Sequence, residues 1–167
     1  MLLPNERRSL EECLRPPVGF SLDCAIATTF SLDLLALLEA PLAFTMFEWQ
    51  ESGQRPRAAD PIVLHGIRRY ADRIHLFCQA GRIEVPSQYE RLYTFIEDMV
   101  IEVLPPQQGV FHPKVWVLRL TSTEDAELPA RYRLLCLSRN LLCRGLLLCL
   151  ALLGMGTGPS PIAFRRS

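Results

Sequence analysis

Two short polar pairs interrupt stretches that are otherwise largely apolar. His112 and Lys114 lie in GVFHPKVWVLRL, and Ser138 and Asn140 lie in RYRLLCLSRNL. A neutral imidazole can attack phosphorus, an ammonium can offset the charge of phosphate oxygens, and hydroxyl and amide groups can fix their orientation. These four residues therefore predict a phosphoryl-transfer site that needs no metal and no other cofactor.

Both stretches alternate like strands, so a spacing of two places each pair on one face of its strand. An antiparallel hairpin with its turn centred near Ala126 would set His112 opposite Asn140 and Lys114 opposite Ser138. Cross-strand neighbours lie about 4.5–5.5 Å apart, so the four groups would surround a phosphate-sized space. A one-residue change of register would separate the pairs. A solvated strand edge is the simpler interpretation, and the proline between the histidine and the lysine fits such an edge.

The motif HPK, followed on the next strand by SRNL, resembles the HxK…GSxN signature of the phospholipase D superfamily, or HKD family. The stretch RPPVGFSLDCAIATTFSLDLLALL resembles the opening strand and helix of bacterial phospholipase D-like proteins. The resemblance covers roughly residues 15–141. It implies a phosphodiesterase in which His112 is nucleophile or general acid and Lys114 and Asn140 bind phosphate oxygens. Ser138 stands where the family has its serine.

The chain departs from the family pattern. The family's aspartate is Arg119 here, its glycine is Leu137, and TSTEDAELPA is an apparent insertion in the hairpin. The family's mechanism needs two histidines, but neither His65 nor His75 has a lysine two residues on. The resemblance therefore implies half a site, completed by a homodimer partner or a missing segment. The alternative is a non-catalytic protein, either a truncated or degenerate remnant or a phosphate-binding module.

Strands that alternate with helices predict an α/β fold with a mixed β-sheet and flanking helices, here a phospholipase D-like half-domain with a single HKD motif. Ser31 is expected to cap a first helix that Pro41 ends, and Asp60 to cap a second. The predicted strands are 18–30, 73–81, 98–106, 109–120 and 131–141, and the predicted helices are 32–40, 61–72 and 89–98.

The chain has 167 residues, of which 49% are hydrophobic and 22% charged, which suits one globular domain. We expect an N-terminal arm (1–17), a phospholipase D-like α/β domain (18–140) and an atypical Leu-rich tail (141–167). The tail is either a terminal helix or sequence not selected for this fold, as a frameshift would give. The formal net charge is zero, so any contact with a polyanion must come from a local patch.

The sequence favours a cytoplasmic protein with reduced thiols. Its start has no apolar signal core, and its six cysteines include no CxxC pair that would indicate a metal cluster. The longest apolar run, LLLCLALLGMG, is well below the roughly 20 residues that span a bilayer. Nothing suggests secretion or a membrane-binding face. We therefore expect a phosphodiester substrate that is nucleic acid rather than lipid, as for a nuclease.

Overall fold

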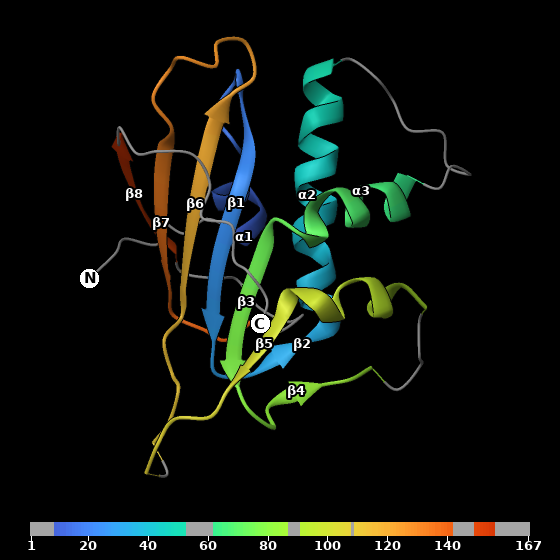
Figure 1. Ribbon diagram of the computed structural model, residues 1–167, viewed down its shortest axis with the longest axis vertical. Coiled ribbons are helices and arrows are strands. Elements are labelled where there is room, and N and C mark those ends of the chain that lie inside the picture. Colours follow the sequence, from blue (N-terminus) through green and yellow to red (C-terminus); the bar gives the residue numbers. More distant parts are fainter. Residues whose placement is uncertain (1–8, 53–61, 87–90, 108, 142–148, 156–167) are drawn as a thin grey trace.

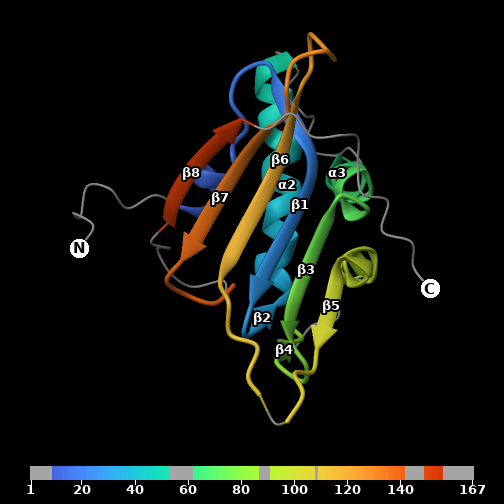
Figure 2. The ribbon, with the colours of Figure 1, turned by 60° about the vertical axis from the view of Figure 1, so that its left-hand side comes forward.

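The computed structural model describes residues 9–52, 62–86, 91–107, 109–141 and 149–155. They form a mixed α/β structure in which helices lie against one face of a six-stranded sheet (Figures 1 and 2). The strand order is β5-β3-β1-β6-β7-β8. The strands are β1 (Phe20–Thr29), β3 (Ile74–Gln79), β5 (Val100–Val103), β6 (Val115–Ser122), β7 (Arg131–Leu137) and β8 (Cys149–Met155).

The helices and a small second sheet complete the described structure. The helices are α1 (Leu10–Leu14), α2 (Leu34–Ser52), α3 (Ile62–Ala71) and two 3₁₀ turns, η2 (Arg91–Phe95) and η3 (Glu97–Met99). The small sheet pairs β2 (Leu32–Asp33) with β4 (Ile83–Glu84) in parallel. Within the described residues, no helix is long and apolar enough to span a membrane.

Parallel and antiparallel pairing meet at β1. Strands β1, β3 and β5 are mutually parallel, whereas β6, β7 and β8 are joined to β1 and to one another by antiparallel pairs. The predicted mixed sheet is thereby confirmed. The carboxyl ends of β1 and β3, the start of β6 and the end of β7 consequently lie at the same end of the sheet (Figure 2).

The core lies between the helices and the sheet face that they cover. Every second residue of β3 and β6 is buried, as expected for strands with one packed face. A register shift in β1 between Leu22 and Cys24 lets Leu22 and Ala25 both face the helices. The largest fully buried side chains include Trp116, Tyr70, Phe44, Leu14, Leu37 and Met99.

Helix α2 does not end at Pro41, so the predicted end of the helix is wrong. The helix continues to Ser52, and Phe44 and Phe47 bury their side chains in the continuation. This burial outweighs the backbone hydrogen bond that a proline removes. The predicted cap at Ser31 is also wrong, since the Leu35 amide donates to the Asp33 carboxylate at 2.8 Å.

The other predicted segments are confirmed in part. The second helix is confirmed as α3, although Asp60 and Pro61 lie outside the described residues. The segment predicted to be helical over 89–98 forms 3₁₀ turns where it is described. Within the predicted tail, 149–155 form strand β8 rather than a terminal helix, while α1, within the predicted arm, buries Cys13 and Leu14 in the core.

Candidate active site

His112 and Lys114 lie just before β6, not within a strand as the alternation predicted. Strand β6 begins at Val115, and the preceding segment belongs to a loop that extends past the end of the sheet (Figures 1 and 2). Pro113 has no amide hydrogen to donate to a neighbouring strand, which explains why pairing stops there. The prediction that these residues share a strand face is therefore wrong.

The two side chains nevertheless meet. The Lys114 ammonium lies 2.9 Å from both ring nitrogens of His112. His112 is exposed, and Lys114 is half-buried. A neutral imidazole has one acceptor nitrogen, so only one of these two contacts can be a hydrogen bond donated by the ammonium. An anion arriving here would find an exposed imidazole and a cation side by side.

An aromatic ring and a second cation adjoin this pair. The ring of Phe30, just after β1, lies 5.2 Å from the His112 ring, and the Arg82 guanidinium lies 5.4 Å from the centre of the Phe30 ring. Such contacts restrict the orientation of the imidazole and keep positive charge near it. The corner formed by Phe30, Arg82, His112 and Lys114 is called the basic corner below.

Two consecutive threonines at the end of β1 hold the chain segments that form this region. Thr28 accepts a hydrogen bond from the Val115 amide at 3.0 Å and donates to the Val115 carbonyl at 3.3 Å. Thr29, which is buried, accepts from the Leu141 amide at 3.0 Å and donates to the Ser31 carbonyl at 2.8 Å. Thr28 thus fixes the start of β6, and Thr29 fixes the segment that follows β7.

Gln79, at the end of β3, holds the loop from the other side. Its side-chain carbonyl accepts a hydrogen bond from the Phe111 backbone amide at 2.7 Å. Its backbone amide donates to the Phe30 backbone carbonyl at 3.3 Å. The neighbouring Cys78 is no competing nucleophile. Burial and, second, the charge of Glu102 raise the pKa of the Cys78 thiol to about 11, so it stays protonated at neutral pH.

The hairpin of β6 and β7 is confirmed, but its register is one residue away from the predicted one. Val115 pairs with Cys136, and the Leu137 amide donates to the Lys114 carbonyl at 2.8 Å. Lys114 therefore lies opposite Leu137, not opposite Ser138. The observed register sets the buried Leu135 beside the buried Trp116, which explains the difference.

Ser138 and Asn140 lie beyond the last residue of β7. Ser138 is exposed, whereas the side-chain oxygen of Asn140 is buried without a hydrogen-bond partner in the described structure. The chain then crosses toward the end of β1, where Leu141 bridges to Leu32 and its carbonyl accepts from the Asp33 amide at 3.0 Å (Figure 2). The second pair thus reaches the same end of the sheet by a turn of the chain rather than by cross-strand pairing.

Arg119 and Trp116 have structural roles. Arg119 forms an ion pair with Asp23 of β1. Its side chain lies on the face of β6 opposite to the buried Trp116, Leu118 and Leu120. Trp116 is only 1% exposed and belongs to the core, so it cannot stack on a bound base.

The residues of this region that the motif did not indicate are Thr28, Thr29, Phe30, Gln79 and Arg82. Their only local signal is position, since the first three end one predicted strand and the last two surround the end of another. The carboxyl ends of neighbouring parallel strands meet at one edge, which is where an α/β sheet commonly binds ligands. Of these, Phe30 and Arg82 form with His112 and Lys114 a partly exposed, basic and partly aromatic surface that suits a phosphate.

Comparisons with known proteins add a distant structural likeness. No protein-family model matches the chain, and no curated protein matches it significantly. A crystal structure of a mutant yeast tyrosyl-DNA phosphodiesterase aligns with 84% of this chain at 16% identity and a TM-score of 0.42. The chain spans about a quarter of the length of that structure, since 25% of it is covered. Similarity at this level defines neither the site nor the activity of this chain.

Proposed function

We propose that residues 18–140 form a phospholipase D-like half-domain whose chemistry is the hydrolysis of phosphodiesters. The observation that carries this proposal is the contact between the Lys114 ammonium and the exposed His112 ring. The residues that bracket this contact, Thr28 and Gln79, supply the support that a positioned nucleophile needs.

In the proposed reaction a ring nitrogen of His112 attacks phosphorus. A nitrogen–phosphorus bond forms, the phosphorus–oxygen bond to the leaving group breaks, and the leaving oxygen takes a proton from a second histidine. Lys114 offsets the charge of the nonbridging oxygens. Asn140 and Ser138 hold the phosphate. The Asn140 side-chain oxygen is buried without a partner in the described structure, and rotation of the amide by half a turn would place its NH2 group there as a donor to a phosphate oxygen. Water then cleaves the phosphohistidine.

The second histidine is proposed to come from a second half of the site, either in a homodimer partner or in a further segment. His65 lies on α3 and His75 within β3, and neither has a lysine two residues on. A nucleic-acid substrate fits the basic corner, since Arg82 and Phe30 would adjoin a phosphate next to a base. The cytoplasmic location remains a proposal from the sequence.

The test is hydrolysis of a chromogenic phosphodiester by the purified chain, measured together with its mass in solution. His112→Ala should abolish turnover, by about a thousandfold or more, without a change of fold. His65→Ala, which changes an exposed histidine of α3, is the matched control and should keep full activity. An acid-labile phosphate bound to the wild-type chain, and absent from His112→Ala, would identify the intermediate. Activity that survives His112→Ala would refute the proposal.

A second candidate function is phosphate binding without cleavage. Arg119 favours it, because the position where the family has an aspartate carries a cation that is already paired with Asp23. A strictly monomeric chain that binds a single-stranded oligonucleotide but hydrolyses no phosphodiester would support this candidate. In that case His112→Ala and Lys114→Ala would both weaken binding.

A further inference from the structure

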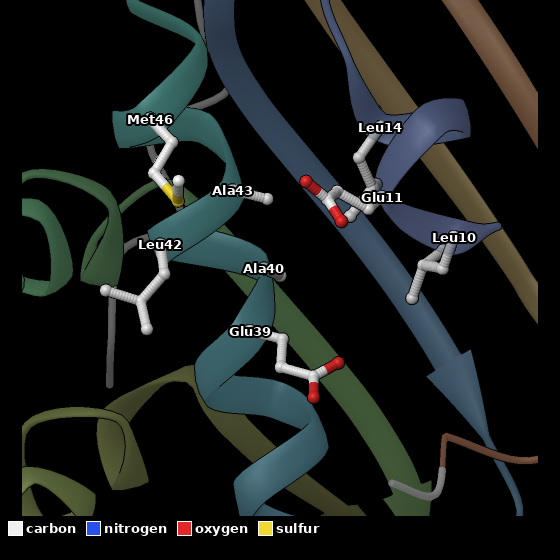
Figure 3. A pocket seen from close by; sticks show the side chains of 8 residues that line it. All are labelled: Leu10, Glu11, Leu14, Glu39, Ala40, Leu42, Ala43 and Met46. Atoms are coloured by element: carbon white, nitrogen blue, oxygen red, sulfur yellow. The ribbon is translucent and has the colours of Figure 1, made fainter. Parts of the chain in front are cut away.

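An open groove lies between α1 and α2 (Figure 3). Its volume is about 290 Å³. The residues that line it are Leu10, Glu11 and Leu14 of α1 and Glu39, Ala40, Leu42, Ala43 and Met46 of α2. Two carboxylates and several apolar side chains thus share one recess.

The groove exists because α2 presents small side chains where it passes α1. Ala40 and Ala43 are 2% and 7% exposed, and Leu14 across from them is 1% exposed. A larger side chain at either alanine would occupy the space between the helices. The depth of the groove is therefore set by these two residues.

An apolar stripe continues the groove along α2. Leu35, Leu42 and Met46 follow one another with Glu39 at helical spacings of three and four residues, so the four share one face. Leu35 is 43% and Met46 50% exposed, although Leu37 and Phe44 on the other side of the helix are fully buried. Leu42, between them, is partly buried against the core, so the exposed apolar surface lies at the two ends of the stripe, where another element can cover it.

The groove is also negatively charged. Glu11 and Glu39 extend into the space between the helices from opposite sides (Figure 3). The ion pairs within the described part of the chain are Arg69–Glu48 and Arg119–Asp23, so neither carboxylate of the groove has a described cationic partner. An occupant with a positive charge would supply that partner.

We propose that this groove binds an amphipathic helix of a partner protein, with a lysine or arginine among its apolar residues. The stripe from Leu35 to Met46 is about 16 Å long, which corresponds to three turns of helix. This length is greater than that of a small ligand. Its spacing matches the i, i+4, i+7, i+11 positions by which one helix lies against another. The basic residue would lie between Glu11 and Glu39.

A second copy of this chain does not fit the groove. Symmetric antiparallel pairing of two α2 helices would set Leu35 against Met46 of the other copy and Glu39 against Leu42. The two Glu39 carboxylates would then be enclosed close together without a cation, which is unfavourable. The charge of the groove therefore favours a different, basic partner. This inference is independent of the activity proposed for His112.

The experiment uses the whole chain and two synthetic helical peptides of about 16 residues. The first has leucines at i, i+4, i+7 and i+11 and lysines beside them, and the second has glutamates in place of the lysines. Binding is measured by fluorescence anisotropy of the labelled peptides. We expect the lysine peptide to bind, Glu39→Gln to weaken it about fivefold and Ala43→Met, which fills the groove, to weaken it about tenfold or more.

Glu127→Gln, in the exposed loop between β6 and β7, is the matched control and should leave binding unchanged. Thermal unfolding shows whether the Ala43→Met variant is folded. If that variant is not folded, the effect of Glu39→Gln on peptide binding tests the proposal instead. Equal binding of both peptides, failure of the lysine peptide to bind, or equal weakening by Glu39→Gln and Glu127→Gln would each overturn the proposal.

Discussion

The middle of β6 and the segment just before it are held in place by different forces. In the middle, Trp116, Leu118 and Leu120 are buried, and backbone pairing joins β6 to β1 on one side and β7 on the other. Before Val115, the Phe111 amide donates to the Gln79 side chain, and the Lys114 carbonyl accepts from the Leu137 amide. Packing thus defines the strand, and a few polar side chains define the candidate site. Mutations in the two regions should separate stability from function.

The largest effect on stability is expected at the packed middle of β6. Trp116→Ala should lower the free energy of unfolding by about 3–5 kcal/mol, because it removes a large buried side chain and leaves a cavity. Val117→Ala, on the next residue, should cost less than about 1 kcal/mol, since Val117 is 39% exposed. Denaturant titration of both variants measures the difference. Similar losses would contradict the one-sided packing of the sheet.

A smaller loss is expected where α2 and α3 touch. A methyl group at Gly66 would collide with the side chain of Thr45, whose hydroxyl donates to the Pro41 carbonyl at 2.8 Å. Gly66→Ala should therefore cost about 1–3 kcal/mol. Adding Thr45→Ala should restore part of that loss, and a double-mutant cycle measures the coupling. Strict additivity of the two changes would show that the helices do not meet there.

Thr29→Val tests the polar contacts that hold the candidate site. The valine has nearly the same shape but cannot bond the Leu141 amide or the Ser31 carbonyl, so two backbone groups lose a partner. The expected loss of stability is about 1–3 kcal/mol. Phosphodiesterase activity should fall by more than the unfolded fraction explains, because Asn140 adjoins Leu141.

Thr121→Val is the control for this variant, since Thr121 lies near the other end of β6. It should leave activity unchanged. Activity lost to the same degree in Thr29→Val and Thr121→Val would mean that the anchor of Leu141 has no bearing on the site.

The same contrast explains what the sequence could predict. Alternation and turn residues located β1, β3, β5 and the β6–β7 hairpin, because burial of one face leaves a periodic pattern. The register of that hairpin depended on a long loop and on which of two apolar residues meets Trp116, and neither is visible in local spacing. Pro41 misled because its effect on a helix is local, whereas the burial of Phe44 and Phe47 is a property of the whole fold.

The candidate site was predictable only in its motif. His112 and Lys114 stand out because polar groups are rare in such stretches, and the structure brings them into contact. The support from Thr28, Thr29 and Gln79 connects residues that are distant in sequence, and no spacing rule indicates it. The roles of Ser138 and Asn140 stay predictions.

The smallest effect on stability is expected at Glu39, a carboxyl among the apolar side chains of α2. Partial burial, and then the charges of Asp33 and Glu11, raise the pKa of the Glu39 carboxyl above its ordinary value of 4.5. The folded chain thus holds this proton more tightly than the unfolded chain. The contribution to stability is present below the ordinary pKa and is lost as the pH rises through the raised one.

Glu39→Gln removes this dependence on pH. The variant should be as stable as the wild type near pH 4 and slightly more stable near pH 7. The gain in free energy of unfolding should be less than about 1 kcal/mol, because the side chain is largely exposed and screened. Thermal melting of both proteins across that range measures the difference. A variant that is less stable at pH 7 than at pH 4, relative to the wild type, would show that a cation already neutralises Glu39 in the folded chain. The groove would then have no unpaired charge to offer a basic partner.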